Sequence, residues 1–431
     1  MTPIDDSLPA RITTDCPEEA RHVLLHAYSR DLDELKKALN AREKANARDP
    51  KTGETPLHAA IRSCGAAAAA LSSKNENSEE IHDDDSDGIV EEAEAVVKEL
   101  FMSGAIWNDA DSNNETPGCV ALRLGRTSLY QICVQAGVRA ELLFALMDGY
   151  EQLSSGSEDE GMEDSETVDV QDGDISPPNG PTTGEQTGAG TTTTNGNDNE
   201  VTSEAYLKSS LTYDEGKLVD SDLNGVMMAW ETDIMERSVA ALLPDDEPGK
   251  RILNIGFGMG IIDAKFAEKK PSRHHIIEAH PTVLEHISSS KSNFNQEWEK
   301  SGGDNDEYKV YAGKWQDVVP KLLEQGEQYD AIYFDTFGED YSQLRMFFTE
   351  HVPGLMDFEG RFSFFNGLGA DRKICYDVYE KVVEIHAADA GLDLSWEQVP
   401  VEMSNMQEEG KGEWEGVRRR YWTLDSEYCG R

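Results

Sequence analysis

The chain has 431 residues, a length that predicts two or three domains. Its 84 acidic residues outnumber 39 lysines and arginines, and the formal net charge is −45. This excess argues against a binder of nucleic acid or of membrane surfaces, because such proteins present basic surfaces. The net negative charge suits a cationic partner, although an acidic surface exposed to solvent would explain much of this charge as well. Six scattered cysteines without a C-x-x-C pair, and the lack of a signal peptide or a long apolar stretch, predict reduced thiols in the cytoplasm and nucleus.

Residues 49–60 carry a repeat-like motif, D-P-K-T-G-E-T-P-L-H-A-A. Its second half resembles the ankyrin-repeat signature T-P-L-H-x-A. In that signature Thr55 caps a helix, Pro56 occupies the first helical turn, and His58 bonds back across the loop. The motif therefore predicts a helix that begins directly after Thr55.

A second copy of the motif follows in residues 109–121. Glu115-Thr116-Pro117 is kept, but Gly118-Cys119 replaces the expected Leu-His. We therefore predict a small all-α domain over residues 1–150, made of two or three degenerate ankyrin-repeat-like units. Its role is either structural or the binding of a partner protein. Apolar-periodic stretches predict its helices at residues 23–39, 93–102 and 129–146.

Two acidic segments interrupt the helical pattern. An insertion near residues 72–87 includes D-D-D and is expected to form a long loop. Residues 151–200 contain no Lys, Arg, Phe, Tyr or Trp and consist mostly of Glu, Asp, Ser, Gly, Thr, Pro and Asn. Such a segment has too little apolar surface to offset its ordering entropy, so we predict an acidic, disordered linker.

Strands and helices alternate from residue 201 to residue 431. Repeated strand–helix units predict a parallel sheet with helices on both faces, and two final strands without an intervening helix predict an antiparallel hairpin at one edge. This α/β pattern resembles the seven-stranded, Rossmann-like sheet of class I methyltransferases, where ligands lie beyond the carboxyl ends of the strands. The predicted strands are 251–255, 275–278, 309–312, 331–334, 361–365, 395–401 and 420–424, and the predicted helices are 261–269, 282–294, 315–324, 344–356 and 374–390.

The first of these strands runs into a glycine loop, R-I-L-N-I-G-F-G-M-G. Its glycines, Gly256, Gly258 and Gly260, are spaced two apart, and Ile261 stands where a dinucleotide fingerprint needs its third glycine. The spacing suits a cofactor without a pyrophosphate, such as S-adenosylmethionine, although glycine-rich turns also serve as tight connections. The residues between and after the glycines that are expected to contact the cofactor are Phe257, Met259, Ile261 and Ile262.

Two further strands end in residues suited to the same ligand. Glu278 follows the glycine loop by about twenty residues, where a carboxylate can accept hydrogen bonds from both ribose hydroxyls. It could also be a solvated strand end. Ala279 and His280 are expected to line the adenine. After the third strand, Trp315 and Gln316 could hold the adenine ring, although Trp315 could equally belong to the core.

Two acidic residues are candidates for contact with the substrate. Asp335 ends the fourth strand in the sequence Y-F-D-T-F, where it either faces the reaction cleft or caps a turn. Glu231 follows Trp230, and Met235 lies one helical turn beyond it, so both Glu231 and Met235 can project into one cleft. The alternative is an ordinary amphipathic helix packed on the sheet.

Four motifs, in order, resemble those of guanidinoacetate N-methyltransferase. The whole chain is more similar to a related fungal family, the type IV protein arginine N5-methyltransferases, in which ankyrin-like repeats precede the same catalytic domain. The resemblance covers the catalytic half closely and the front half loosely. The double-glutamate hairpin and Thr-His-Trp loop of ordinary protein arginine methyltransferases are missing, which counts against dimethylation of the terminal nitrogens. The motifs are W-E-T-x-x-M at 230–235, G-F-G-M at 256–259, I-I-E at 276–278 and Y-x-D-T at 333–336.

The resemblance implies that S-adenosylmethionine donates one methyl group to the internal (δ, N5) guanidino nitrogen of arginine residues in a protein. It also implies that Tyr206 and Met235 close over the cofactor and that Asp335 borders it. A guanidinium is planar, carries five donors and has a pKa above about 12, so the paired carboxylates of Glu231 and Asp335 are its natural clamp. One of the two would receive the released proton.

The expected partners are S-adenosylmethionine, without a metal, and a basic protein that contains the target arginine. We expect the chain to be a monomer. Two other functions stay open: a small-molecule guanidino N-methyltransferase, and an ankyrin scaffold with a non-catalytic cofactor fold. The helical half, which a small substrate would not need, favours a protein substrate. The intact glycines, together with Glu278 and Asp335, favour catalysis.

Overall fold

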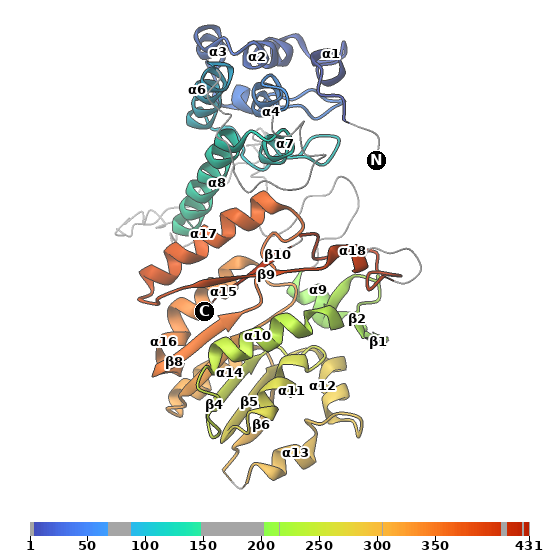
Figure 1. Cartoon of the computed structure of the whole chain (residues 1–431), viewed down its shortest axis with the longest axis vertical. Helices are drawn as coiled ribbons and strands as arrows, with labels where there is room; N and C mark the ends of the chain where they lie inside the picture. Colours follow the sequence, from blue (N-terminus) through green and yellow to red (C-terminus); the bar gives the residue numbers. More distant parts are fainter. Residues whose placement is uncertain are drawn as a thin grey trace, which may run out of the picture.

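The computed structural model of the chain describes residues 4–67, 88–147, 202–214, 216–303, 305–406, 412–424 and 426–430. Figure 1 shows two regions: the described residues up to 147 form a helical region, and the described residues from 202 onward form a larger α/β region below it. The predicted acidic insertion and the predicted linker both lie outside the described residues. The domain boundaries at residues 150 and 200 therefore stay predictions.

The helices of the first region form two rows. Helices α2, α4 and α7 contact one another in turn, and α3, α6 and α8 form a second row against them. Each helix of the first row is thus followed along the chain by its partner in the second. The bounds are α1 Leu8–Arg11, α2 Glu18–Ser29, α3 Leu32–Ala38, the 3-10 helix η1 Arg42–Asn46, α4 Pro56–Arg62, α6 Gly88–Met102, α7 Pro117–Arg123 and α8 Thr127–Met147.

The helix starts predicted from the repeated motif are confirmed. The Thr55 side chain accepts a hydrogen bond from the backbone N–H of His58, and Pro56 occupies the first turn of α4. His58 Nε2 donates to the backbone oxygen of Glu115 at 2.9 Å, which ties α4 to the loop before α7. Thr116 caps α7 in the same way as Thr55 caps α4. The assignment of the whole region to the ankyrin repeats stays a prediction.

The α/β region opens with elements that the sequence analysis missed. These are helix α9 (Ser203–Lys208) and a small antiparallel sheet of β1 (Thr212–Asp214), β2 (Lys217–Val219) and β3 (Gly225–Met228). The elements that follow are η2 Ala229–Glu231, α10 Thr232–Leu242, β4 Arg251–Ile255, α11 Ile261–Glu268, β5 Arg273–Glu278, α12 Pro281–Ser288, α13 Gln296–Ser301, β6 Tyr308–Ala312, α14 Trp315–Glu324, β7 Tyr329–Phe334, α15 Tyr341–Met346, the π-helix η3 Phe347–His351, α16 Val352–Leu355, β8 Met356–Phe364, α17 Lys373–Asp389, β9 Trp396–Pro400, α18 Met403–Met406 and β10 Ser426–Gly430.

The main sheet has five parallel strands in the order β6-β5-β4-β7-β8. The predicted seven-stranded sheet is corrected, because β9 and β10 form a separate antiparallel ladder. The prediction of a strand at residues 420–424 was also wrong. Trp422 is fully buried, and its indole N–H donates to the backbone oxygen of Leu424 at 2.6 Å, so the chain turns there and becomes extended only from Ser426.

Alternate side chains of the central strand β4 enter two different cores. Ile252 packs into the core under α10, α11 and α12, whereas Leu253 and Ile255 pack into the core under α14, η3 and α17. Successive residues of a strand point to opposite faces, so a strand with buried apolar side chains on both faces needs helices on both. The predicted arrangement of helices on both faces is confirmed. The carboxyl ends of all five strands meet at one edge of the sheet.

The helical region rests on α17. Helix α8 packs along α17 (Figure 1), and one hydrophobic core contains side chains from both regions. The hydroxyl of Tyr130 on α8 donates to Asp377 at 2.6 Å, and the hydroxyl of Tyr379 donates to Glu141 at 3.1 Å.

By length and composition alone, helix α8 could cross a membrane, contrary to the prediction that the chain has no long apolar stretch. Its packing against α6, α7 and α17 accounts for the apolar residues in its first half as those of a core helix, whereas Leu143, Phe144, Leu146 and Met147 near its end are exposed.

Gly118 explains why the second copy departs from the repeat signature. A Cβ at residue 118 would lie 1.8 Å from Cδ1 of Ile374 on α17. The leucine that the signature expects would therefore require the Ile374 side chain to move. Glycine at position 118 thus leaves room for α7 of the helical region to pack closely against α17 of the α/β region.

Candidate functional site

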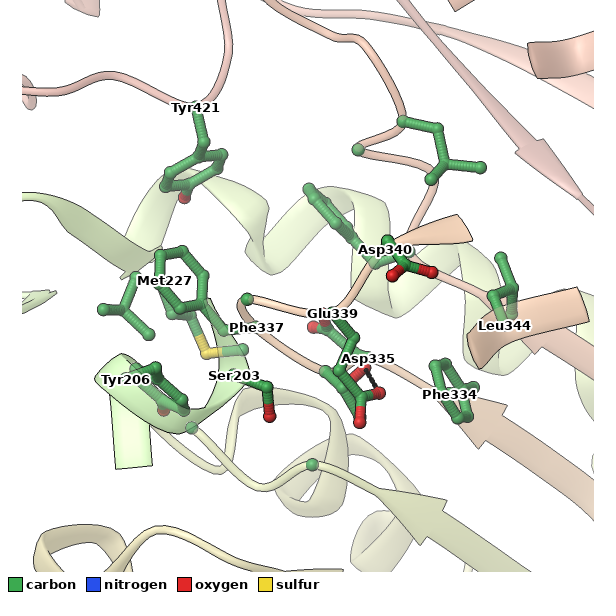
Figure 2. A pocket seen from close by; sticks show the side chains of 18 of the residues that line it. Ser203, Tyr206, Met227, Phe334, Asp335, Phe337, Glu339, Asp340, Leu344 and Tyr421 are labelled. Atoms are coloured by element: carbon green, nitrogen blue, oxygen red, sulfur yellow. Dashed lines mark hydrogen bonds between the residues drawn. The ribbon is translucent and has the colours of Figure 1, made fainter. Parts of the chain in front are cut away.

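A cavity of about 490 Å³ lies at the carboxyl edge of the sheet. Loops after β4, β5, β6, β7 and β8 contribute to its lining, as do α9, β3 and the segment after α6. Figure 2 shows Tyr206, Met227, Asp335 and Tyr421 gathered around it. The volume is in the range of small-molecule sites. The predicted site residues that line it are Tyr206, Glu231, Gly256, Gly258, Glu278, Ala279, Trp315, Gln316 and Asp335.

The other predicted cofactor residues lie behind this lining. Met235 is fully buried in the core between α10 and the sheet, because α10 turns that side chain inward. The ring of Phe257 packs beneath the glycine loop, where a Cβ on Gly260 would lie 2.4 Å from its Cζ. Their contact with a cofactor stays a prediction. The residues that do not line the cavity are Met235, Phe257, Met259, Gly260, Ile261, Ile262 and His280.

The glycine loop brings the ends of β4 and β7 together. Gly256 has a φ of +91°, and a Cβ there would lie 1.8 Å from the backbone oxygen of Asp335. Gly258 has a φ of +54°, and a Cβ there would lie 2.8 Å from Cε and Sδ of Met227. Both positions need a residue without a side chain, since both combine positive φ with close neighbours. The loop therefore places the backbone of Gly256 and Gly258 at the cavity.

Glu278 is held by backbone N–H groups. Phe257 N–H donates to Oε2 at 2.9 Å, and His280 N–H donates to Oε1 at 2.6 Å. Burial raises the pKa of Glu278 above its ordinary value, although these backbone donors act against the shift. A carboxylate has about four lone-pair sites, so both oxygens keep capacity for a ligand that donates two hydrogen bonds.

Glu339 organises the side of the cavity beside α14. It accepts hydrogen bonds from Trp315 Nε1 at 3.0 Å, from Gln316 Nε2 at 2.8 Å and from Thr336 Oγ1 at 2.7 Å. The indole of Trp315 also packs edge-on against Phe334, so this side chain belongs to the core while it lines the cavity. The alternative that Trp315 belongs to the core is confirmed, and its contact with an adenine ring stays a prediction.

Tyr206 covers the cavity from α9. Its backbone oxygen accepts a hydrogen bond from His280 Nε2 at 3.0 Å, and its ring packs against those of His280 and Phe337. Because His280 Nδ1 accepts from the N–H of Thr282 at 3.1 Å, the Nε2 atom carries the proton. Burial lowers the pKa of His280, which favours this neutral form. His280 therefore positions Tyr206 rather than lining the cavity.

Glu231 lies in η2, directly before α10, and is 2% exposed. Its Oε1 accepts hydrogen bonds from the N–H of Met228 at 2.7 Å and from the hydroxyl of Tyr421. Burial raises the pKa of Glu231 to about 8, and the negative charge of Asp335 adds to the shift. Glu231 lines the cavity, whereas Met235, which was expected to project into the same cleft, does not.

Asp335 follows β7, and its backbone N–H donates to Ile255 at 2.8 Å. Its Oδ2 is buried and has no hydrogen-bond partner among the described residues. Burial raises the pKa of Asp335 to about 7, and the negative charge of Glu278 adds to the shift. The cavity thus contains a carboxylate oxygen that still needs a donor.

The sequence analysis missed four kinds of lining residue. Met227 comes from β3, Tyr421 from the segment before β10, Glu339 from the loop after β7, and Trp107 with Asn108 from the helical region. A tyrosine that bonds a glutamate 190 residues away leaves no local sequence signal. Within the parts of the chain that the structure describes, no group of three or more His, Cys, Asp or Glu side chains is arranged to hold a metal ion.

Comparisons with known proteins relate the chain to methyltransferases. The profile of the guanidinoacetate N-methyltransferase family matches residues 196–385. A protein of Gibberella zeae named protein arginine N-methyltransferase 2 is 65% identical over 98% of this chain and 94% of its own length. Its namesake in Neurospora crassa is 57% identical over 98% of this chain and 97% of its own length. Among solved structures, Aeropyrum pernix fibrillarin with bound S-adenosyl-L-methionine superposes with a TM-score of 0.28 and 16% identity, over 47% of this chain and 81% of that one, which is too weak a likeness to carry an argument.

Proposed function

Because this chain belongs to the family of proteins named protein arginine N-methyltransferase 2, we propose that it methylates arginine side chains in a protein substrate, with S-adenosylmethionine as the methyl donor. We further propose that it adds one methyl group and that the internal (δ, N5) nitrogen receives it. The observation that carries the proposal is the pair of carboxylates, Glu231 and Asp335, in the same cavity as the glycine loop. Glu231 is buried, and Asp335 is half-buried with its Oδ2 atom buried.

The residues at the floor of the cavity fit S-adenosylmethionine. Gly256 and Gly258 leave room for a ligand against the backbone, and Glu278 can accept hydrogen bonds from the two ribose hydroxyls. Trp315 and Gln316, both held by Glu339, would border the adenine. When bound, S-adenosylmethionine supplies an electrophilic methyl group on its sulfonium.

Glu231 and Asp335 would hold the substrate guanidinium from two sides. A guanidinium presents several N–H donors in one plane, and each carboxylate can accept more than one of them. Asp335 Oδ2 has no partner within the described residues, and both hydrogen bonds to Glu231 reach Oε1. Two carboxylates would also balance the positive charges of substrate and donor, which a single carboxylate could not.

The same carboxylates can receive a proton. As the new N–C bond forms and the C–S bond breaks toward sulfur, the attacking nitrogen must lose its proton. Asp335, whose pKa is raised to about 7, is a suitable acceptor near neutral pH because a catalytic base works best with a pKa close to the working pH. Tyr421 holds Glu231 in place through its hydroxyl, which leaves Asp335 as the freer of the two.

Mass spectrometry of methylated peptides tests the proposed position of the methyl group. A methyl group on a terminal nitrogen leaves as methylamine on fragmentation, whereas an internal methyl group stays with the side chain while ammonia is lost. We expect the second pattern with a single added methyl group. Loss of methylamine, or a second methyl group on one arginine, would overturn the proposed position while leaving the arginine methyltransferase activity in place.

Free guanidino compounds are the second candidate substrate. The match to the guanidinoacetate N-methyltransferase profile favours them, because that match covers much of the α/β region. Parallel assays with guanidinoacetate and with arginine peptides distinguish the two substrates. We expect a higher kcat/KM for the peptides.

A further inference from the structure

The cavity crosses the boundary between the two regions of the molecule. Most of its lining comes from the α/β region, but Trp107 and Asn108 come from the helical region, in the segment between α6 and α7. On the facing side lie Cys375 and Tyr379 of α17, the helix on which the helical region rests. One continuous cavity therefore connects the clamp residues Glu231 and Asp335 with the helical region.

The helical wall of this cavity is held rigidly. A Cβ on Gly137 of α8 would lie 2.6 Å from Cγ2 of Val378 and 3.1 Å from the ring of Trp107. Only a glycine allows α8, α17 and the Trp107 segment to meet so closely. Trp107 is 4% exposed, and beside it Glu141 of α8 accepts a hydrogen bond from Tyr379 of α17. The position of Asn108 relative to the clamp is thus set by packing.

Asn108 offers an unused amide group at this wall. It is half-buried and lines the cavity, and its side chain has no hydrogen-bond partner within the ranges that the structure describes. An asparagine side chain carries one acceptor oxygen and two donor hydrogens, the set that matches a peptide group of a main chain. An extended backbone passing this wall could therefore be bound without regard to its side chains.

We propose that the arginine-bearing segment of a protein substrate lies between the two regions, with its main chain against Trp107 and Asn108 and its target guanidinium between Glu231 and Asp335. This inference rests on the proposed function. The positive guanidinium complements the two carboxylates, and the cavity continues from them to the wall of the helical region. A free guanidino compound would need only the clamp. The helical region therefore contributes directly to substrate binding.

Methyl transfer by the purified full chain tests this inference with two probes. One probe is guanidinoacetate, and the other is a mixture of short peptides with a single central arginine and randomised flanking residues. The variants are Asn108→Trp, which fills the wall, and Asn108→Ala, which removes only the amide. Asn113→Trp is the matched control, because Asn113 is an exposed residue of the same region outside the cavity. Melting temperature and calorimetry with S-adenosylmethionine check that each variant is folded.

For Asn108→Trp we expect kcat/KM with the peptides to fall at least about tenfold more than with guanidinoacetate, since the bulky ring excludes a backbone. For Asn108→Ala we expect a selective fall of about fivefold, the effect of one hydrogen bond. Asn113→Trp should match the unmodified protein. If Asn108→Trp does not fold, Asn108→Ala decides the question.

The inference is overturned if the unmodified protein methylates the peptides and both folded Asn108 variants do so equally well. It is also overturned if the unmodified protein methylates guanidinoacetate alone, because no peptide then occupies the cavity. Methylation of neither probe would overturn the proposed function itself, and the inference with it.

Discussion

The two regions of the molecule bury acidic side chains in opposite ways. In the helical region, Glu54 and Asp111 are each 1% exposed, and both pair with arginines of the same region. Glu54 Oε2 lies 3.0 Å from Arg11 Nε and 3.2 Å from Arg62 Nε, and Asp111 Oδ2 lies 2.6 Å from Arg62 Nη2. Burial still raises the pKa of Glu54, but both arginines oppose that shift. In the helical region, arginine side chains of the same chain therefore neutralise the buried carboxylates.

The cavity of the α/β region contains acids without such partners. Among the described residues, no lysine or arginine forms an ion pair with Glu231, Glu278 or Asp335. Glu278 depends on backbone N–H groups, and Glu231 on a backbone N–H and a tyrosine hydroxyl. A buried charge without a counter-ion is unfavourable, so these carboxylates indicate a site for a cationic ligand. The acids of the helical region are paired within the chain, and we propose that the unpaired acids of the cavity bind a cationic ligand.

Asp335→Asn gives the largest effect that we expect. It keeps the shape of the side chain but removes the charge and the proton acceptor, so single-turnover methyl transfer should fall about 10²–10⁴-fold. Glu231→Gln should behave alike, and the double variant should be little worse than either single one, because both residues hold one group. Cofactor affinity, measured by calorimetry, should change far less. Transfer by Asp335→Asn at the unmodified rate would refute the clamp.

Arg62→Met tests the paired acids of the helical region. It leaves Glu54 and Asp111 with Arg11 alone, and removal of one partner from a buried ion cluster lowers the free energy of unfolding by about 3–5 kcal/mol. Lys98→Met is the matched control, because the Lys98 side chain is 59% exposed in its pair with Glu94, and such surface pairs contribute about 0–1 kcal/mol. Urea denaturation of the full chain measures both. Equal losses in the two variants would contradict the comparison.

Glu278→Ala tests whether an unpaired acid binds the cofactor. The variant should lose two charge-assisted hydrogen bonds to the ribose, each contributing roughly 1.5–3 kcal/mol. We expect S-adenosylmethionine affinity to fall at least about tenfold in calorimetry, with the fold preserved. An unchanged affinity would mean that another residue holds the ribose.

The pH dependence of kcat/KM is a further effect that we expect. In the free protein the pKa of Asp335 is raised to about 7 and that of Glu231 to about 8, so acidification neutralises the clamp before substrate binds. Activity on an arginine peptide should therefore decrease as pH falls from about 9 to about 6, by about tenfold per unit below the pKa of one essential base. Asp335→Asn should lose part of this dependence. A flat profile in the unmodified protein would show that Glu231 and Asp335 are ionised over the whole of this pH range.

The sequence alone predicted the central part of the fold. The predicted bounds of β4 and α14 match the structure, because an apolar run that ends in glycines and a strongly periodic helix are local patterns. The antiparallel sheet β1–β3 was missed, since its strands have only three or four residues. The last strand was misplaced, because Trp422 looks like a strand residue in the sequence and is instead buried at a turn.

The sequence also predicted which residues end the strands at the cavity. Gly256, Glu278 and Asp335 could be placed there without coordinates, because the carboxyl ends of parallel strands share one edge of a sheet. What the sequence could not give was the direction of each side chain. Met235 was expected to project into one cleft with Glu231, yet the docking of α10 turns it into the core.

Only the tertiary structure decided how distant segments complete the site. Tyr421 bonds Glu231 across 190 residues, Glu339 gathers Trp315 and Gln316, and the helical region reaches the cavity through Asn108. These contacts depend on how α8, α17 and the segment before β10 pack together. Hydrophobic periodicity specifies which face of an element is buried, but it carries no information about which distant element covers that face.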